Sequence, residues 1–506
     1  MLRSVDQPQG VSLRHLLPSA EFHGARDIRV TSCAGDSRIC RPGDLFVALE
    51  GTRHDGHDFA RHAAARGASA VLAERALPLG GLPTCIVPDT RKAYGQLCQA
   101  LAGNPSHRLK VIGVTGTNGK TTTAALIAGV LEAAGCRTGI IGTLGYYDGV
   151  DVQPAVLTTP SAPMLATWLA RMEANGCTHA VVEVSSHALS QARIAGIELD
   201  CGCVTNVRRD HLDYHGSLAN YRSAKARLFD YLTPDALAVL NADDAVASSF
   251  LSLLDRPTLT VGLRAAAEIT GALVERFKSE QTFLLSAGSD TVAVRTQMIG
   301  DHHIQNCLMA AAVGFGYGFD LATVVRGLES VGHVPGRLER IECGQPFGLF
   351  VDYAHTPHAL CSALDALRDV TQRRLICVFG AGGERDTMKR PLMGRAVEKR
   401  ADVVIVTTDN PRHENPETIV YDILAGCERP SQVELIADRA EAIHRALRLA
   451  EPGDCVLIAG KGHEAEQIIG NERRSFDDRD VARSWLYNVC DHEPQSSGRS
   501  MAIGNY

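Results

Sequence analysis

The sequence predicts an α/β protein of three domains: a small mixed α/β domain, a central domain with a parallel sheet, and a C-terminal Rossmann-like domain. At roughly 150 residues per domain, a length of 506 residues indicates about three domains. A buried-strand pattern at 111–114 leads into a glycine-rich turn and an alanine-rich helical stretch from about 121 to 134. Strand and helix patterns then alternate afresh from about Gly336, which is typical of a doubly wound domain.

The first predicted domain covers residues 1–105. Short apolar runs alternate there with Gly/Pro turns, as where 41–44 leads into the apolar run 45–49. A polar break at 103–106 precedes the next buried strand. We therefore expect a separate small domain before residue 106.

The central domain is predicted to cover residues 106–335. A second strand pattern, at 180–184, follows a helix-like stretch at 163–175, as in a parallel sheet with crossover helices. Ligands of such sheets collect at the carboxyl ends of the strands. The third domain is predicted at 336–490, with strands at 349–353, 375–379, 403–406 and 455–459, and a polar tail that frays at 491–506.

Composition argues against a polyanionic partner and against a membrane protein. The 51 basic and 58 acidic residues give a net charge of −7, without a basic block for nucleic acid or an anionic membrane. There is no signal-peptide pattern and no apolar run of 18 residues. The fifteen cysteines form no C-x-x-C pair and are interpreted as reduced. A cytoplasmic monomer is expected.

A glycine-rich segment between the first strand and helix of the central domain predicts a phosphate-binding loop. It consists of Gly116, Thr117, Asn118, Gly119, Lys120, Thr121 and Thr122. Backbone N–H groups, the helix N-terminus and Lys120 would bind the phosphates of ATP, and Thr121 would ligate Mg²⁺. The general G-x-x-x-x-G-K-[ST] pattern would place its first glycine on Val114, so the match is incomplete. The alternative is a glycine turn before a helix without a ligand.

Metal ligands for this loop are expected at the ends of neighbouring strands. Glu183 ends a predicted strand, and its carboxylate with the Thr121 hydroxyl is a donor set that suits Mg²⁺. His211, taken alone, is more often a packed or surface side chain. Zinc bound by His211, Asp213 and His215 is the weaker interpretation, because neither a cysteine pair nor a third strong ligand lies nearby.

Three segments together resemble the Mur ligase family: the loop 116–122, the segment 183–187 (Glu-Val-Ser-Ser-His) and the segment 210–215 (Asp-His-Leu-Asp-Tyr-His). The resemblance extends over nearly the whole chain. It implies a uridine-binding first domain, a central ATPase domain and an amino-acid-binding third domain. The segment 409–412 (Asp-Asn-Pro-Arg) further implies transfer of meso-diaminopimelate to the D-glutamate γ-carboxylate of UDP-N-acetylmuramoyl-L-alanyl-D-glutamate, in peptidoglycan precursor synthesis.

The implied reaction passes through an acyl phosphate, so that the substrate carboxylate and not a side chain attacks the γ-phosphate. Such chemistry needs positioning and charge neutralisation, which Lys120 and two Mg²⁺ ions would supply. The resemblance implies catalytic roles for Lys120, Glu183, His211 and Lys225, and metal ligation by Thr121, Glu183, His211 and Lys225.

Lys225 falls where the family carries a lysine carbamylated by CO₂. From the sequence alone it is an ordinary helical lysine. Because CO₂ adds to a neutral amine, a carbamate there requires a depressed pKa, and its oxygens would ligate the second Mg²⁺.

Recognition of diaminopimelate is implied for residues of the third domain. Arg385 and Arg412 would hold the distal carboxylate, which lysine lacks, and two buried unpaired guanidinium groups would then disfavour lysine by several kcal/mol. Asp409 and Asn410, with Gly460 and Glu464, would bind the distal ammonium, and Pro411 belongs to the same motif.

Further contacts are implied by the resemblance alone. Those with the UDP-muramoyl dipeptide are Ser37, Thr52, Arg53, His54, Thr158, Thr159, Ser185, Gln191 and Arg193, and those with ATP, beyond the loop, are Asn306, Arg337 and Asp352. The chain departs from the family pattern at His303, where asparagine is usual, and at His358 and Arg208.

Two alternatives remain open from the sequence. One is a related ligase that adds L-lysine, or that adds glutamate to folate, which would share the phosphate loop and differ in the third domain. The other is a P-loop NTPase that acts as a switch without ligase activity.

Overall fold

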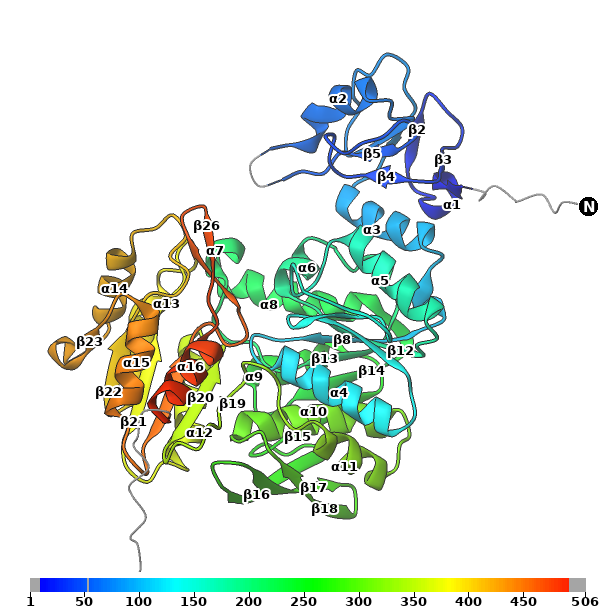
Figure 1. The fold of residues 1–506 in the computed structure, drawn as a ribbon. Helices are drawn as coiled ribbons and strands as arrows, with labels where there is room; N and C mark the ends of the chain where they lie inside the picture. The colour runs from blue at the N-terminus through cyan, green and yellow to red at the C-terminus, as the bar shows by residue number, and fades with distance from the viewer. Residues whose placement is uncertain (1–9, 52–53, 491–506) are drawn as a thin grey trace, which may run out of the picture. The chain divides into compact units, whose positions relative to one another are not determined.

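The computed structural model describes residues 10–51 and 54–490, so Thr52, Arg53 and the predicted tail 491–506 lie outside the described residues. The described chain divides into two compact units. One comprises the residues up to Ala272 with Leu284–Val294 and Ile304–Val331, and the other comprises Leu273–Phe283, Arg295–His303 and the residues from Gly332. Three large sheets follow one another along the chain, and they confirm the predicted three-domain α/β class (Figure 1).

The N-terminal sheet is mixed and has the strand order β2-β7-β6-β5-β4. Its strands are β2 (Glu21–His23), β4 (Cys33–Ala34), β5 (Leu45–Val47), β6 (Ala70–Ala73) and β7 (Thr84–Ile86), and its helices are α1 (Leu13–Leu16), α2 (Ala60–Ala65) and α3 (Thr90–Leu101). A further pair, β1 (Val11–Ser12) and β3 (Arg29–Val30), is antiparallel. Only β2 runs antiparallel in the five-stranded sheet.

The central sheet has the order β11-β10-β9-β12-β8-β13-β14-β15-β16-β17-β18, and it is parallel from β9 through β16. The strands are β8 (Lys110–Thr115), β9 (Thr138–Gly142), β10 (Gly145–Tyr147), β11 (Val152–Gln153), β12 (His179–Glu183), β13 (Leu199–Val204), β14 (Leu232–Asn241), β15 (Thr258–Gly262), β16 (Ile269–Arg276), β17 (Gln281–Ala287) and β18 (Asp290–Thr296). The helices are α4 (Lys120–Ala133), α5 (Ala162–Ala174), α6 (Ser186–Ser190), α7 (Leu212–His215), α8 (Leu218–Ala226), α9 (Ala245–Ser249), α10 (Asp301–Gly316) and α11 (Leu321–Ser330).

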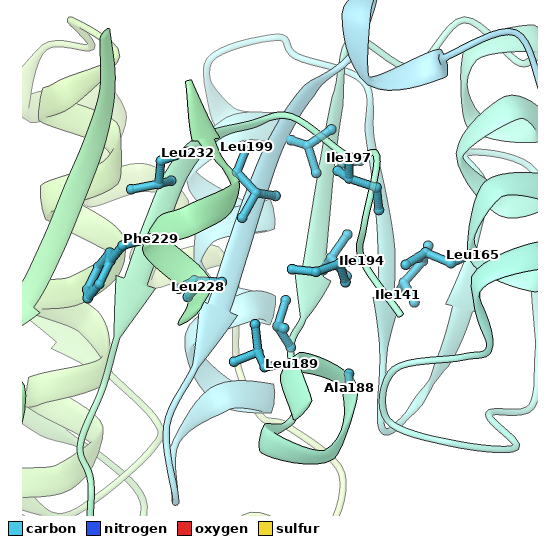
Figure 2. Close-up of a cluster of buried hydrophobic side chains, with 14 of the residues drawn as sticks. Ile141, Leu165, Ala188, Leu189, Ile194, Ile197, Leu199, Leu228, Phe229 and Leu232 are labelled. Carbon is cyan, nitrogen blue, oxygen red and sulfur yellow. The ribbon is translucent and has the colours of Figure 1, made fainter. Parts of the chain in front are cut away.

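Apolar packing beneath the phosphate loop fixes β8 in the middle of this sheet. Figure 2 shows Leu199, Leu228 and Leu232 among the buried side chains of one hydrophobic cluster. A Cβ at Gly113 of β8 would lie 2.9 Å from Leu199 Cδ1 and 3.1 Å from Leu228 Cδ1, so both leucines pack directly on the strand. Close packing of this kind leaves little freedom to the strand that carries the loop.

The C-terminal sheet has the order β19-β20-β24-β21-β22-β23, parallel except for β19. The strands are β19 (Glu339–Arg340), β20 (Gly348–Asp352), β21 (Leu375–Phe379), β22 (Val403–Val406), β23 (Glu434–Leu435) and β24 (Cys455–Ala459). The helices are α12 (Pro357–Arg368), α13 (Lys389–Glu398), α14 (Pro416–Leu424), α15 (Arg439–Leu449) and α16 (Asp478–Cys490), and a hairpin is formed by β25 (Glu466–Ile469) and β26 (Glu472–Ser475).

Successive side chains of these buried strands point to opposite faces of the sheet and pack into two separate hydrophobic cores. Residues of α12, α13 and α14 pack on one face of the sheet, with Cys377 and Phe379 of β21. Residues of α15 and α16 pack on the other face, with Ile376 and Val378 of the same strand. This is the doubly wound arrangement, and its ligand sites lie beyond the carboxyl ends of the strands. Within 10–51 and 54–490, no helix has the length and hydropathy needed to span a bilayer.

Candidate functional site

The phosphate loop lies between the end of β8 and the start of α4, as predicted. Gly116 and Gly119 have φ angles of 153° and 86°, which residues other than glycine rarely adopt. A Cβ at Gly116 would lie 1.8 Å from Thr205 Oγ1, and one at Gly119 would lie 2.5 Å from Asn306 Oδ1. The two glycines therefore allow neighbouring segments to approach the loop backbone closely.

The segment after β13, at Thr205 and Asn206, makes hydrogen bonds with the phosphate loop. Thr205 Oγ1 donates to the Asn118 carbonyl at 2.6 Å, and Asn206 Oδ1 accepts the Asn118 N–H at 2.9 Å. The Asn206 carbonyl accepts the Thr117 N–H at 2.9 Å. Because parallel strands β8 and β13 are neighbours, their carboxyl ends meet here, but the sequence alone did not identify this support.

Glu183 and Thr121 lie together, as predicted for a magnesium site. The Thr121 hydroxyl donates to Glu183 Oε2 at 3.0 Å, and the Thr143 N–H donates to Glu183 Oε1 at 2.8 Å. Glu183 is 1% exposed. A buried carboxylate beside a hydroxyl at a helix N-terminus is a hard oxygen donor set that fits Mg²⁺. Lys120 Nζ donates to the Gly116 and Thr117 carbonyls at 2.8 and 3.1 Å, which folds the lysine over the loop.

Tyr221 of α8 connects the loop to the other two predicted catalytic residues. Its hydroxyl lies 3.0 Å from Thr117 Oγ1, and Lys225 Nζ lies 4.7 Å from the centre of its ring. The His211 ring centre lies 6.5 Å from the Tyr221 ring centre. Lys225 is 1% exposed, and burial, followed by the positive charge of Lys120, lowers its pKa well below the ordinary value. The depressed pKa is what a site for CO₂ addition requires.

His211 caps the short helix α7 in the left-handed conformation, with φ of 52°. Its backbone N–H donates to Asp210 Oδ1 at 2.9 Å, and its ring lies edge-on to His187 at 4.8 Å. His215, the other histidine of the zinc alternative, lies 3.0 Å from Ser186 Oγ. Among the described residues, no group of three or more His, Cys, Asp or Glu has the arrangement of a metal site.

Asn306 of α10 approaches the phosphate loop from a distant part of the sequence. Its Oδ1 accepts the Thr123 hydroxyl at 3.2 Å, next to Gly119. Thr122, the last residue of the predicted loop, is buried in the first turn of α4. The loop and Asn306 thus form one region of the first unit.

The residues expected to contact the muramoyl peptide form a hydrogen-bonded network next to Glu183. Thr159 Oγ1 donates to the Glu183 carbonyl at 2.7 Å and accepts the Ser185 N–H at 2.9 Å. Arg193 donates to the Thr159 carbonyl at 2.7 Å and, through Nη2, to Gln191 Oε1 at 2.7 Å. Burial lowers the pKa of Arg193 because it desolvates the guanidinium charge, and a bound anion would stabilise that charge.

Three other residues expected to contact the UDP-muramoyl dipeptide lie outside the Arg193 network. Thr158 Oγ1 lies 3.1 Å from Thr143 Oγ1, so it borders the Glu183 region. In the N-terminal domain, Ser37 is buried with its hydroxyl 3.0 Å from His62 Nδ1, and His54 packs edge-on to Phe59 at 6.1 Å. These contacts are local, and the structure does not bring Ser37 or His54 into the network around Arg193.

In the second unit, the segment 409–412 and the segment 460–464 lie side by side at the carboxyl ends of β22 and β24. Asn410 Nδ2 donates to Glu464 Oε2 at 2.8 Å, and a Cβ at Gly460 would lie 2.6 Å from Asp409 Oδ2. Arg412 Nη1 donates to the Gly383 carbonyl at 2.6 Å. Pro411 is buried between these residues in the chain. The hydrogen bond from Asn410 to Glu464 joins the two segments, which the family resemblance assigns to one pocket.

The pocket differs from expectation at Arg385. Arg412 is half-buried, and burial, followed by the charge of Arg385, lowers its pKa. Arg385 is exposed in the loop between β21 and α13, so the prediction of two buried guanidinium groups is wrong for this residue. Water solvates an exposed guanidinium, and the large cost of an unpaired buried charge then applies to Arg412 alone.

Arg337 and Asp352 lie in the second unit around Tyr353. The Arg337 guanidinium stacks 4.7 Å from the Tyr353 ring centre, and Asp352 accepts the backbone N–H groups of Leu338 and Ala354 at 2.6 and 2.7 Å. Burial raises the pKa of Asp352. His303, the departure from the family pattern, is buried with neither ring nitrogen hydrogen-bonded in the described chain, and burial lowers its pKa.

A phosphate loop at the carboxyl end of a parallel strand, beside a buried hydroxyl–carboxylate pair, defines a P-loop nucleotide-binding enzyme. Family models match three stretches: the Mur ligase family catalytic domain over residues 29–100, the Mur ligase middle domain over 114–314, and the Mur ligase glutamate ligase domain over 336–462. The chain belongs to the Mur ligase family, and it is an ATP-dependent amide ligase.

Two similar relatives are each named UDP-N-acetylmuramoyl-L-alanyl-D-glutamate–2,6-diaminopimelate ligase. The one from Geobacillus thermodenitrificans is 42% identical over 92% of this chain and 97% of its own length. The one from Syntrophomonas wolfei is 40% identical over 92% of this chain and 96% of its own length. A solved structure of a ligase of the same name is 34% identical, with a TM-score of 0.68, and covers 96% of this chain and 100% of that one.

Proposed function

We propose that this enzyme joins meso-diaminopimelate to the γ-carboxylate of the D-glutamate in UDP-N-acetylmuramoyl-L-alanyl-D-glutamate, using ATP, in the cytoplasm and as a monomer. The names of the relatives support the two substrates. The observation that carries the proposal is that Arg412 and Glu464 lie near enough to influence each other electrostatically, with Asn410 hydrogen-bonded to Glu464. One anion-binding and one cation-binding group suit a free amino-acid centre.

The proposed chemistry begins with the substrate carboxylate, which attacks the γ-phosphorus of ATP and displaces ADP. The amine of diaminopimelate then attacks the acyl carbon, and inorganic phosphate leaves. The chain positions these groups and supplies no nucleophile. Lys120 and the N–H groups of Gly116 to Thr122 would hold the phosphates, and Asn306, Arg337 and Asp352 would contact the nucleotide.

The proposed magnesium ligands are Thr121 and Glu183, with His211 and carbamylated Lys225 for a second ion. The 3.0 Å contact of Thr121 with Glu183 supports the first pair. When bound, Mg²⁺ would neutralise the charge of the transferring phosphate. The buried position of Lys225 and its depressed pKa support the carbamate.

The UDP-muramoyl dipeptide is proposed to extend from the Arg193 network to the N-terminal domain. Thr158, Thr159, Ser185, Gln191 and Arg193 would contact the peptide end. Ser37, Thr52, Arg53 and His54 would contact the nucleotide end. The corresponding domains are proposed at 1–105, 106–335 and 336–490.

In the pocket of the third domain, the distal centre of diaminopimelate would pair its carboxylate with Arg412 and Arg385. Its ammonium would lie near Asp409, Gly460 and Glu464. Lysine lacks this carboxylate, so it would leave the half-buried Arg412 without its anion.

Phosphate release tests the proposal. The purified protein is given ATP and Mg²⁺ with the UDP-muramoyl dipeptide, with diaminopimelate, with both, with the dipeptide and L-lysine, or with none of these substrates. Release only when both are present supports the ligase. Release without either substrate would favour a nucleotide switch. Release with the dipeptide and L-lysine, but not with the dipeptide and diaminopimelate, would favour a lysine-adding ligase.

A further inference from the structure

Lys461 occupies an unusual position in the amino-acid pocket. It lies in the turn between β24 and β25 and is fully buried, with an exposed fraction of 0%. Its ammonium donates to Asn410 Oδ1 at 3.3 Å, to Glu464 Oε2 at 3.2 Å and to the Glu466 carbonyl at 2.6 Å. An ammonium has three donors, so all of its hydrogens are used within the protein. Lys461 therefore has no donor left for a ligand.

These contacts determine which end of the Asn410 amide faces the ligand. Asn410 Oδ1 accepts from Lys461 and also from the Ile468 backbone N–H at 2.9 Å. Both lone pairs of this oxygen are thereby used, and the amide nitrogen must point the other way. One of its hydrogens goes to Glu464, at 2.8 Å. The second hydrogen remains as a donor, so Asn410 offers an N–H and not a carbonyl oxygen.

The same contacts divide the Glu464 carboxylate into two different oxygens. Oε2 accepts from both Lys461 and Asn410. Within the described part of this pocket, Oε1 makes no hydrogen bond, and the Glu464 side chain is 33% exposed. An ammonium ligand can therefore bind Oε1 without displacing a contact that holds the carboxylate.

We propose that Lys461 is a positioning residue that sets the polarity of the pocket, with Asn410 as a donor for the ligand carboxylate and Glu464 as an acceptor for the ligand ammonium. The proposal rests on the proposed function, because the ligand is the free amino-acid centre of diaminopimelate. It also changes the role of Asn410, which was expected to bind the ammonium. Without Lys461, the Asn410 amide can rotate and Glu464 can turn both oxygens to the ligand or to Arg412.

The test compares Lys461→Met with the wild-type enzyme. Methionine has a similar length but neither charge nor donors. We expect the KM for diaminopimelate to rise about tenfold or more, and the preference for diaminopimelate over lysine to fall by a similar factor, as for loss of a specific polar contact. The KM for ATP and for the UDP-muramoyl dipeptide should change less than about twofold, since those substrates bind elsewhere. Lys461→Gln, which keeps an N–H donor, should recover part of the preference.

A double-mutant cycle separates positioning from general stability. If Lys461 acts through Asn410, Lys461→Met should lower the amine preference little further in an Asn410→Ala background. The matched control is Arg374→Met, which breaks a 2.7 Å pair with buried Asp454 at the opposite, amino-terminal edge of the same sheet. This control should lower the melting temperature but leave the amine preference unchanged.

Failure of the positioning role and failure of the proposed function give different results. Additive losses in the cycle, or an equal rise in all three KM values, would overturn the positioning role. If Lys461→Met does not fold, Asn410→Asp tests the donor that Lys461 is proposed to orient, because it keeps the acceptor for Lys461 but removes the amide N–H. Unchanged preference in that variant would contradict the proposal. A wild-type enzyme that makes no diaminopimelate product would instead refute the proposed function.

Discussion

Lys225 lies in an environment unlike that of a surface lysine. It is buried in α8, its ammonium lies over the Tyr221 ring, and Lys120 adds a second positive charge nearby. Both desolvation and the like charge favour the neutral amine. The neutral amine is the form that reacts with CO₂, so the buried position favours the proposed modification.

The carbamate predicts an activity that depends on CO₂. Enzyme that is briefly acidified and degassed should lose most of its ligase activity and regain it when bicarbonate is added, while Lys225→Ala should stay inactive in both conditions. Initial rates with and without bicarbonate measure this, and intact-mass spectra should show one added CO₂ only in the wild-type enzyme. Full activity after degassing would argue against the modification.

Lys225 also predicts a dependence of stability on pH. Its folded-state pKa is depressed below the ordinary value of 10.5, so between the two values the unfolded chain binds more protons than the folded one. The free energy of unfolding then rises with pH through that window, and each tenfold change in proton affinity corresponds to about 1.4 kcal/mol. Urea unfolding in CO₂-free buffer without metal should show this rise for the wild type and a flatter profile for Lys225→Met. Parallel profiles would show that the lysine is not deprotonated on folding.

At the scale of elements, the junction of β8 with α4 is set by backbone geometry as much as by side chains. Gly119 precedes α4 with φ of 86°, and the Asn306 side chain fills the space where a Cβ would be. Gly135, beyond the other end of α4, has a similar φ of 79° with nothing within 4 Å. The two glycines thus differ in crowding and not in backbone strain.

This difference predicts that substitution by alanine impairs ATP binding at Gly119 but not at Gly135. Gly119→Ala and Gly135→Ala should each cost about 1–2 kcal/mol of stability from the left-handed backbone. Gly119→Ala should in addition displace Asn306 from Thr123 and raise the KM for ATP about tenfold or more, whereas Gly135→Ala should leave it unchanged. Melting curves and ATP kinetics check this together. An equal ATP effect in both variants would mean that strain alone controls the loop.

The strands of the third domain were predicted well because each is a continuous apolar run buried on both faces. The predicted strands 375–379, 403–406 and 455–459 coincide with β21, β22 and β24. Helix α4 begins at Lys120, one residue before the predicted start. Local composition was enough for these elements.

Residues whose role depends on distant partners could not be found in this way. Tyr221 lies 104 positions from Thr117, and a single tyrosine in a helix gives no signal of that contact. Lys461 lies between Gly460 and Gly462, and this spacing alone does not indicate its contacts with Asn410 and Glu464. Exposure is also a tertiary property, which is why the burial expected of Arg385 was wrong.

At the scale of the whole molecule, the chemistry is divided between two compact units. The phosphate loop, Glu183 and Lys225 belong to the first unit, and the segments 409–412 and 460–464 belong to the second. The nucleotide should therefore protect the phosphate loop of the first unit, and diaminopimelate should protect the amino-acid pocket of the second.

Hydrogen exchange measures this division. ADP with Mg²⁺ should slow amide exchange in residues 116–122, and meso-diaminopimelate should slow exchange in 383–385, 409–412 and 460–469, because ligand contacts suppress local opening. L-lysine at the same concentration is the matched control for the second set. Protection of 116–122 by diaminopimelate alone would contradict the assignment of the amino-acid pocket.

We propose that this ligase selects diaminopimelate through the pocket around Arg412. The most direct measurement is product mass spectrometry with ATP, Mg²⁺, the UDP-muramoyl dipeptide and equal amounts of meso-diaminopimelate and L-lysine, for the wild type and for Arg412→Leu. We expect a diaminopimelate product in large excess for the wild type, and a preference reduced by about a hundredfold in Arg412→Leu, as for loss of a half-buried charge pair. A wild-type enzyme that forms mainly the lysine product, or an Arg412→Leu variant with unchanged preference, would contradict it.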